Sequence, residues 1–301
     1  IGIDNLNDYY DVNLKKARLE KLKKFKNLFN FFKMDISNYK NLSKIFEDNQ
    51  FDIVINLAAQ AGVRYSLLNP TLYLKSNIEG FFNVLECCRV NQISHLIFAS
   101  SSSVYGFNDN YKFSETNETS KPLSFYGATK KSNEVMAYSY SNIYNMKITG
   151  LRFFTVYGPW GRPDMALFLF TKSILSGVPI DVYNNGKVIR DFTYIDDVVD
   201  AIFKISTKES HNHIKNSKNK ENYNLFNIGN GKPIELINYI NLLEEVLKKK
   251  AVKNFLPLPV TDSVRTSSDN KSIEDFVNFK PKTSIKMGVT NFVNWYKDYF
   301  N

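Results

Sequence analysis

The sequence has few of the residues that bind metals or form disulfides. Only two cysteines occur among 301 residues, Cys87 and Cys88, and neighbouring cysteines seldom bond to each other because the geometry is strained. The sequence has three histidines, and it contains no Cys-x-x-Cys motif and no Cys/His cluster. This scarcity argues against a disulfide framework and against structural zinc. We therefore predict no metal site and a reduced, cytoplasmic location.

Long uncharged apolar runs are also lacking. No segment reaches the roughly 20 residues that a membrane-spanning helix needs, and no signal peptide is visible, although the abrupt start leaves an upstream membrane anchor open. The net charge of +9 includes lysine clusters at residues 21–26 and 246–250. No basic stripe with interleaved aromatic residues accompanies them, so we expect a solvated surface and no nucleic-acid partner.

Short apolar runs alternate with amphipathic segments through the first half of the chain. This pattern predicts strands near residues 1–4, 29–35, 51–59, 95–101 and 147–154, and helices over residues 13–24, 42–48, 70–90 and 124–145. Strands that alternate with helices and are apolar throughout indicate a parallel sheet covered on both faces. The predicted fold class is α/β, a doubly wound parallel sheet of the Rossmann type with a smaller α/β domain.

Polar or small residues follow several of the predicted strands. Ligands of open parallel sheets bind at the carboxyl ends of the strands. Those ends carry Asp4 and Asn5, then Asp35 and Ile36, then L-A-A-Q-A-G at residues 57–62. An acid at such a strand end hydrogen-bonds the ribose hydroxyls of NAD and repels the extra phosphate of NADP. Simple caps and tight turns remain the alternative interpretation.

A run of hydroxyl side chains precedes a tyrosine–lysine pair. The strand at residues 95–101 runs into A-S-S-S-S-V-Y-G, residues 99–106, which suits the polar floor of a pocket better than a strand interior. A serine-rich loop is the alternative. Tyr126 and Lys130 are four residues apart and so share one face of a helix. A phenol and an ammonium placed in this way can share a proton, but the Y-x-x-x-K spacing is common by chance.

Longer segments resemble the extended short-chain dehydrogenases/reductases, and specifically the nucleotide-sugar epimerases that act on UDP-glucuronate. The segments are D-N-L-N-D-Y-Y-D (4–11), L-A-A-Q-A-G-V-R-Y-S (57–66), S-S-S-S-V-Y-G (100–106), Y-G-A-T-K-K (126–131), L-R-F-F-T-V-Y-G-P-W-G-R-P-D-M-A-L-F-L-F (151–170), R-D-F-T-Y-I-D-D (190–197) and F-N-I-G-N (226–230). The resemblance implies NAD as cofactor and a UDP-sugar as substrate. It also implies Tyr126 as catalytic base, Lys130 as its partner, and hydroxyls of Ser101 and Ser103 beside the reacting sugar oxygen.

The resemblance also implies which residues bind the two ligands. Cofactor contacts are expected from Asp4, Asn5, Asp35, Ile36, Leu57, Ala58, Ala59, Gln60, Asn77, Ser100, Tyr126 and Lys130. Substrate contacts are expected from Arg64, Ser102, Ser103, Thr155, Arg162, Arg190, Asp262 and Arg265. Thr155, Arg162 and, more weakly, Arg64 are candidates for a sugar carboxylate, because an arginine fork matches a carboxylate. Structural ion pairs are the alternative for both arginines.

Two further features of the family carry over as expectations. Residues 1–157 should form an NAD-binding Rossmann domain to which 188–206 return, with 158–187 and 207–301 forming the nucleotide-sugar domain. Residues 207–221 are polar and are expected to form an exposed loop. The two long helices at 70–90 and 124–145 have apolar residues on more than one face. We expect them to form a homodimer, with ordinary packing on the sheet as the alternative.

One element of the family is missing from this sequence. The family begins with a strand and a G-x-x-G-x-x-G turn that holds the cofactor pyrophosphate at a helix N-terminus, and this chain contains no such turn. We interpret the sequence as a fragment that lacks about 25–30 residues, which should leave two neighbouring strands unpaired. If the turn is genuinely absent, a non-catalytic nucleotide-binding scaffold is the alternative.

The serine run favours one reaction within the family. Relatives that dehydrate or decarboxylate carry carboxylates where this chain has Ser102 and Ser103. The sequence therefore predicts an NAD-dependent isomerase for the 4-epimerisation of a UDP-sugar, UDP-glucuronate to UDP-galacturonate, through a transient 4-keto sugar. A 4-epimerase for UDP-glucose or UDP-N-acetylglucosamine is the alternative.

Overall fold

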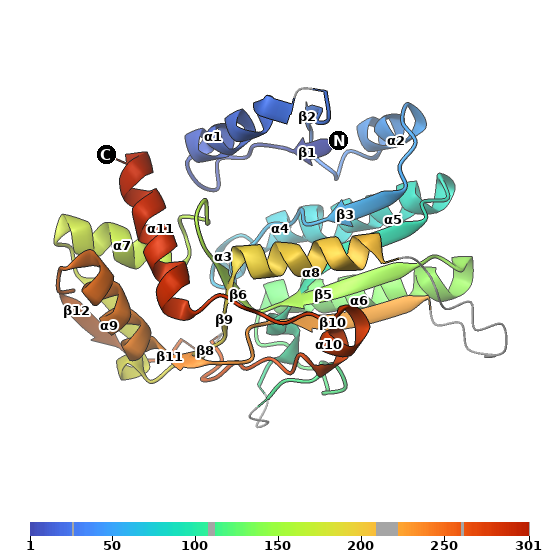
Figure 1. Ribbon diagram of the computed structural model, residues 1–301. Helices are drawn as coiled ribbons and strands as arrows, with labels where there is room; N and C mark the ends of the chain where they lie inside the picture. Colours follow the sequence, from blue (N-terminus) through green and yellow to red (C-terminus); the bar gives the residue numbers. More distant parts are fainter. Residues whose placement is uncertain (26, 108–111, 209–221, 260–261, 301) are drawn as a thin grey trace.

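The main sheet of the protein has four strands, all parallel to their neighbours. The computed structural model describes residues 1–25, 27–107, 112–208, 222–259 and 262–300. The strand order is β10 (Tyr223–Ile228), β5 (Ile148–Phe153), β4 (His95–Ser101) and β3 (Ile53–Asn56). Helices lie on both sides of this sheet (Figure 1), so the predicted α/β class with a parallel sheet is confirmed.

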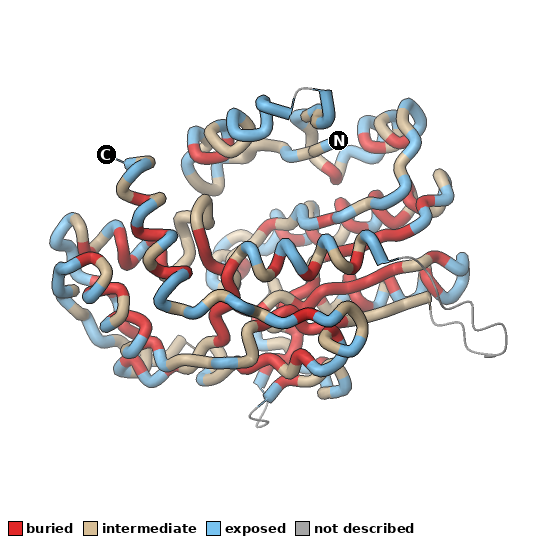
Figure 2. The backbone as a smooth tube through the Cα atoms, in the orientation of Figure 1, coloured by how far each residue is buried: buried red, intermediate tan, exposed pale blue. Residues whose placement is uncertain are grey.

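Two apolar cores fix the main sheet between its helices. On one side α5 (Gly80–Val90) and α6 (Phe125–Tyr144) pack on the strands with α2 (Tyr39–Glu47). On the other side α8 (Ile195–Thr207) and α10 (Lys271–Val277) cover β4, β5 and β10. The two central strands, β4 and β5, are buried over most of their length (Figure 2). Such two-sided burial is what apolar, non-alternating strands require.

The predicted helix at residues 70–90 contains a π-helical segment. It is made of α4 (Pro70–Tyr73), η2 (Leu74–Glu79) and α5, and α3 (Tyr65–Leu68) precedes it. Within η2, the Asn77 side-chain amide accepts from Gln60 N at 2.8 Å and donates to Gln60 O and to the Thr129 hydroxyl. π-Helical turns often occur at functional sites, and this one fixes the segment that follows β3.

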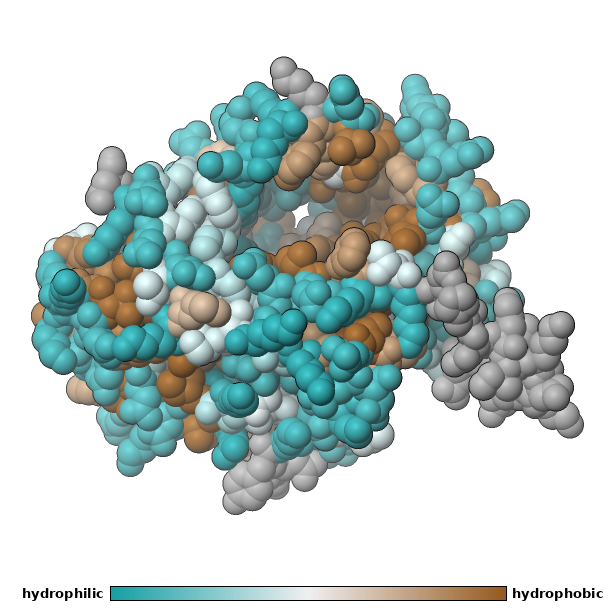
Figure 3. Space-filling model, in the orientation of Figure 1, coloured by the Kyte–Doolittle hydropathy of each residue, from teal (hydrophilic) through white to brown (hydrophobic). Residues whose placement is uncertain are grey.

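Strands β1 (Gly2–Asp4) and β2 (Phe31–Lys33) form a separate parallel pair. The helices α1 (Val12–Leu22) and η1 (Lys23–Phe25) connect the two strands, and α2 follows β2. Among the described residues β1 pairs only with β2, and β3 pairs only with β4, so each of β1 and β3 has one edge without a paired strand there. Figure 3 shows an opening between this unit and the main sheet, bordered largely by hydrophobic residues.

The interpretation of residues 51–59 as a buried strand is wrong. β3 spans only Ile53–Asn56, and Ile53 and Ile55 are 36% and 43% exposed. The physical reason is its position, because the outer edge of β3 has no paired strand among the described residues. Apolar sequence alone cannot report such an exposed edge.

The second lobe contains three two-stranded sheets and three longer helices. The sheets are β6 (Thr155–Tyr157) with β9 (Phe192–Tyr194), β7 (Ile180–Tyr183) with β12 (Lys253–Leu256), and β8 (Ile189–Arg190) with β11 (Ile234–Glu235). The helices α7 (Ala166–Ser176), α9 (Leu236–Leu247) and α11 (Ile285–Phe300) enclose an aromatic-rich core. Two 3-10 turns, η3 (Ser102–Tyr105) and η4 (Asn184–Gly186), complete the elements.

The chain crosses between the lobes more often than the predicted domain division implies. β10, expected in the second domain, lies in the main sheet beside β5, and the remainder of the division stays a prediction. Most of the predicted loop at 207–221 lies outside the described residues. No helix in the described part of the chain is both long and apolar enough to cross a membrane.

Candidate active site

A cleft of about 1520 Å³ lies between the carboxyl ends of the sheet strands and the second lobe. Most of the predicted site residues line it. They are Asp4, Asn5, Asp35, Ile36, Leu57, Ala58, Ala59, Gln60, Arg64, Ser100, Ser101, Ser102, Ser103, Tyr126, Lys130, Thr155, Arg162, Arg190 and Asp262. Asn77 and Arg265 are not among the lining residues. Asn77 acts behind the lining by holding Gln60, and Arg265 bridges Ile189 beside the cleft.

Tyr126 and Lys130 lie on the first turns of α6, facing the cleft. The helix begins at Ser124, whose hydroxyl accepts from Gly127 N at 3.0 Å, as favoured N-cap residues do. Lys130 Nζ donates to the Ala99 carbonyl at 2.9 Å and lies 6.0 Å from the centre of the Tyr126 ring. The predicted pair is therefore assembled at the end of β4.

Burial acts on the acid–base properties of both side chains. It raises the pKa of the Tyr126 phenol, while the Arg162 charge and the neighbouring Ser101 hydroxyl act in the opposite direction. Burial lowers the pKa of the Lys130 ammonium to about 8. At neutral pH this lysine thus stays mostly protonated, and the phenol keeps its proton until positive charge nearby favours its release.

The serine run closes the end of β4 as a hydrogen-bonded turn. Ser101 Oγ accepts from Ser103 N at 3.1 Å, and its hydroxyl donates to Ser103 Oγ at 3.1 Å. The hydroxyl of Ser100 turns the other way and donates to Glu134 Oε1 at 2.6 Å. Ser101 and Ser103 thus remain candidates for a bound sugar oxygen, to which Ser101 can redirect the proton it shares with Ser103, whereas the Ser100 hydroxyl donates to the buried Glu134 carboxylate.

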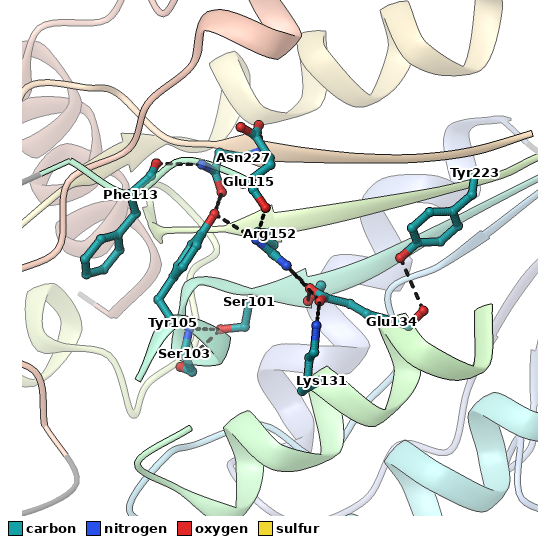
Figure 4. A network of polar contacts seen from close by, with 11 residues as sticks. Ser101, Ser103, Tyr105, Phe113, Glu115, Lys131, Glu134, Arg152, Tyr223 and Asn227 are labelled. Atoms are coloured by element: carbon teal, nitrogen blue, oxygen red, sulfur yellow. Dashed lines mark hydrogen bonds and ion pairs between the residues drawn. The ribbon is translucent and has the colours of Figure 1, made fainter. Parts of the chain in front are cut away.

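A buried ion pair beneath the serines was not predicted. Arg152 on β5 donates from Nε and Nη2 to the two carboxylate oxygens of Glu134 on α6, at 2.8 and 2.9 Å (Figure 4). Arg152 also donates to the Tyr105 hydroxyl, which donates to Asn227 Oδ1. Two signals in the sequence point to this pair: Glu134 falls on the Tyr126–Lys130 helix face, and a charged residue within an apolar strand needs a partner.

The two ends of the cleft offer different groups to a dinucleotide. At one end Asp4, with 53% of its side chain exposed, offers a carboxylate acceptor for ribose hydroxyls. Asp35 stays ionised because hydrogen bonds from Ser37 and Asn5 outweigh burial, so that its pKa lies below the ordinary value. At the other end the Lys130 ammonium has only a carbonyl contact and no ion pair among the described residues. These donors and acceptors fit the two riboses of NAD, one at each end of the cleft.

Arginines and aspartates alternate around the part of the cleft that faces the second lobe, where Arg64 precedes α3 and Arg162 and Arg190 belong to the second lobe. Arg64 pairs with Asp262 at 2.8 Å and lies over the Tyr183 ring, and Arg162 pairs with Asp164 at 3.0 Å. The alternative interpretation of both arginines as ion-pair members therefore describes their contacts in this structure. Burial, with the charge of Arg64 acting in the same direction, lowers the pKa of Arg190 to about 10, although the Asp262 carboxylate opposes this shift.

No group of three or more His, Cys, Asp or Glu side chains arranged to hold a metal occurs among the residues that the structure describes. The two cysteines are free and buried. The polar groups that converge in the cleft are thus hydroxyls, amides, carboxylates, arginines and the two lysines Lys15 and Lys130.

Comparison with known proteins gives consistent matches along the chain. Residues 2–229 match the model of the NAD dependent epimerase/dehydratase family. Protein CapI of Staphylococcus aureus is 49% identical over 313 residues, covering 100% of this chain and 91% of that protein. UDP-glucuronate 4-epimerase 4 of Arabidopsis thaliana is 44% identical over 308 residues, covering 100% and 70%.

A solved structure agrees with these sequence matches. The UDP-glucuronic acid 4-epimerase from Bacillus cereus, in complex with UDP-glucuronic acid and NAD, superposes with a TM-score of 0.88 at 32% identity. The match covers 99% of this chain and 90% of that one. The chain therefore belongs to the NAD dependent epimerase/dehydratase family, as its motifs predict.

Proposed function

We propose that this protein is an NAD-dependent UDP-glucuronate 4-epimerase that forms UDP-galacturonate. The observation that carries the proposal is the convergence of Tyr126, Lys130 and Ser101 on one wall of a cleft whose other wall presents Arg162. The names of the Arabidopsis thaliana and Bacillus cereus relatives support the substrate. The family supports NAD as the cofactor.

The residues assigned to the cofactor divide between the ends of the cleft. Asp4 would hold the adenosine ribose and Asp35–Ile36 the adenine, while Tyr126 and Lys130 would hold the nicotinamide ribose. When bound, NAD supplies the acceptor, and afterwards the donor, of a hydride at sugar C4.

The proton at the sugar 4-hydroxyl is handled by side chains of the chain itself. Tyr126, as phenolate, takes this proton while C4 becomes a ketone, and Ser101 donates a hydrogen bond to the same oxygen. The Lys130 ammonium stabilises the phenolate. After the keto-sugar turns over, Tyr126 returns the proton to O4 as C4 is reduced on the other face. The inverted hydroxyl is the only net change.

The end of β4 supports epimerisation rather than elimination. Ser102 and Ser103 occupy the positions where relatives that eliminate or decarboxylate carry carboxylates. A hydroxyl at the ordinary pKa is a poor general acid or base at pH 7. A site with one acid–base phenol and no carboxylate beside it can oxidise and re-reduce the sugar, but it lacks a group that would eliminate water.

A uronic acid oxidised at C4 is a β-keto acid and can lose CO₂. To keep its carboxylate, the keto-sugar must be bound with that group in a fixed orientation. We assign this role to Arg162 and Thr155, with Arg64 as a third candidate. Arg190, Arg265 and Asp262 are assigned to the uridine diphosphate. One observation favours the neutral-sugar alternative: Arg162 is already paired with Asp164.

The test is direct conversion. The purified protein with NAD and UDP-glucuronate should form UDP-galacturonate, followed by proton NMR of the anomeric signals. Tyr126→Phe should lower kcat by about 10²–10⁴, because a positioned acid–base group contributes that much. Conversion of UDP-glucose but not of UDP-glucuronate would favour the alternative substrate. Conversion by Tyr126→Phe at the wild-type rate would refute the mechanism.

We also propose a homodimer through the outer faces of η2–α5 and α6. Leu74, Phe82 and Tyr138 are 51%, 44% and 59% exposed on these helices, and an apolar groove runs between the helices beside Leu74 and Met136. An exposed apolar surface of this kind is typical of an interface. Sedimentation should show a dimer, and Phe82→Glu should shift it to monomer.

The two free cysteines support a cytoplasmic location.

A further inference from the structure

The loop that carries Arg162 is held in place by a carboxylate and a phenol. Asp164 Oδ1 accepts from Arg162 Nε at 3.0 Å, and Asp164 Oδ2 accepts from Arg162 Nη2 at 3.2 Å. Tyr9, far away in the sequence, donates its hydroxyl to Asp164 Oδ2 at 3.0 Å. All three side chains line the cleft. The residues thus form a chain in which Tyr9 fixes Asp164 and Asp164 fixes Arg162.

A guanidinium has two edges that can each hold a carboxylate. The edge made of Nε and Nη2 is taken by Asp164 in this structure. The other edge combines Nη1 with the second proton of Nη2, and no hydrogen bond among the described residues uses Arg162 Nη1. Nη2 also lies 3.4 Å from Met165 Sδ, a weak acceptor that a carboxylate oxygen can replace. An arginine whose first edge is occupied can therefore receive a second carboxylate in a defined direction.

Tyr9 itself sits in a prepared position. Its hydroxyl lies where a side chain at Gly62 would intrude, because a Cβ there would come within 2.5 Å of the oxygen. Its ring lies 4.8 Å from that of Tyr65. Burial, followed by the charge of Asp164, raises the pKa of Tyr9 to about 12, so the phenol keeps its proton and acts as a donor.

The backbone of the same loop is anchored separately. Arg18 Nη2 donates to the Trp160 carbonyl at 2.7 Å and to the Gly161 carbonyl at 3.3 Å. The Trp160 ring packs against Trp295 on α11. Because the backbone does not depend on Asp164, loss of this carboxylate should release the Arg162 side chain without releasing the loop.

We propose that Asp164 is a positioning residue for substrate selection: together with Tyr9 it turns the free edge of Arg162 toward the carboxylate of an acidic UDP-sugar. This inference rests on the proposed function and adds a residue to it. The opposite expectation is simple repulsion, in which Asp164 lowers the affinity for an acidic ligand. Orientation should outweigh repulsion here, since both side chains are partly exposed and water screens the charge.

The experiment compares two ligands that differ in the sugar acid. Calorimetry with excess NAD would give the Kd of UDP-glucuronate and of UDP, which has no carboxylate. Wild-type protein should bind UDP-glucuronate more tightly than UDP. Asp164→Asn should weaken UDP-glucuronate binding at least tenfold and leave UDP within twofold, with KM raised more than kcat is lowered. Tyr9→Phe should give a smaller loss of about threefold.

A double-mutant cycle separates positioning from a general effect on the cleft. In an Arg162→Ala background, Asp164→Asn should not weaken UDP-glucuronate further, because the residue acts through Arg162. The control variant is Asp275→Asn, which removes an exposed carboxylate paired with Lys271 on α10. It should leave the Kd of both ligands unchanged.

Three results would overturn the proposal. They are tighter or unchanged UDP-glucuronate binding in both Asp164→Asn and Tyr9→Phe, an equal loss of UDP binding, or a persisting effect of Asp164→Asn in the Arg162→Ala background. A wild-type protein that does not prefer UDP-glucuronate over UDP would instead refute the carboxylate recognition in the proposed function, and this inference with it. The ligand comparison therefore distinguishes the two failures.

Discussion

Glu134 and Arg152 form a doubly hydrogen-bonded ion pair in which the two side chains are 3% and 2% exposed. Ser100 Oγ donates to the same carboxylate, so α6, β4 and β5 meet at one group. Removing one member of such a pair leaves an uncompensated charge in a medium of low polarity. The pair joins the helix that carries Tyr126 to the strands beneath it.

We expect Glu134→Gln to lower the free energy of unfolding by about 3–5 kcal/mol, the usual effect of breaking a buried pair. Replacing both partners, as in Glu134→Met with Arg152→Met, should cost less than the sum of the single substitutions. Guanidinium unfolding of Glu134→Met, Arg152→Met and the double variant measures this. Lys131, partly exposed and 3.4 Å from Glu134, provides the control, and Lys131→Ala should change stability by less than about 0.5 kcal/mol. Additive single effects would contradict direct coupling.

His95 should make the protein less stable in mild acid. It is buried beside Thr149, and burial lowers its pKa to about 4. An unfolded histidine titrates near 6.5, so between these values the unfolded chain binds a proton that the folded chain does not. Stability is therefore lost as the pH falls through 6.5 toward 4, by about 2 kcal/mol between pH 7.5 and 5.

The variant His95→Gln removes this titration. Urea unfolding at pH 7.5 and 5 should show a stability loss smaller than that of the wild type by about 2 kcal/mol. Only the difference between the two pH values matters, since the substitution also changes packing. An identical pH dependence in both proteins would show that His95 is accessible to protons in the folded state.

Lys130 should set the alkaline limit of activity. Its ammonium, with a pKa lowered to about 8 by burial, is charged below that pH and loses its charge above it. Stabilisation of the Tyr126 phenolate is thus present below about pH 8 and lost above it, and kcat should fall there. Lys130→Met should lower kcat by about 10²–10⁴ below pH 8, and its difference from the wild type should shrink as the wild-type lysine loses its charge at higher pH.

The arginine variant of the same residue tests the charge directly. Arginine keeps its proton up to about pH 12, so Lys130→Arg should lose the alkaline fall even if its kcat is reduced. The pH profile of kcat from 6 to 10 is the measurement. A fall near pH 8 that persists in Lys130→Arg would assign the limit to another group.

Asp191 should be required for stability rather than for chemistry. Its fully buried carboxylate accepts from the backbone N–H groups of Asn230, Gly231 and Ser268 at 2.8–2.9 Å. Asp191→Asn replaces one acceptor by a donor facing these N–H groups, and we expect a loss of roughly 2–4 kcal/mol. Thermal unfolding measures it, with the exposed variant Asp275→Asn as control. A loss below about 0.5 kcal/mol would show that water replaces the missing acceptor.

The main elements of the sheet were predictable because their signals are local. Non-alternating apolar runs mark β4 and β5, and Ser124 followed by a long amphipathic segment marks α6. Tyr126, Lys130 and the serines could be brought together because parallel strands end at the same edge. The family resemblance supplied the assignments on the second lobe, which local patterns do not give.

What the sequence did not reveal are choices of partner made across long distances. Tyr9 meets Asp164 from 155 positions away, and Arg152 meets Tyr105 from 47. Neither contact has a periodic signal, because the first depends on how the two lobes pack and the second on where the turn after β4 lies relative to β5. The predictions for β10 and β3 were wrong for the same reason. The position and burial of a strand depend on the neighbours that it packs against in the fold.

Helix α6 uses its two sides for unrelated purposes. Lys130, Asn133, Glu134 and Ala137 are buried on the inner side, whereas Val135 and Tyr138 on the outer side are 56% and 59% exposed. In the proposed dimer, mutations on the outer side would change the contact between copies without altering the inner stripe, and the reverse also holds. Assembly and turnover become traits that evolution, or a protein engineer, can adjust one at a time along a single helix.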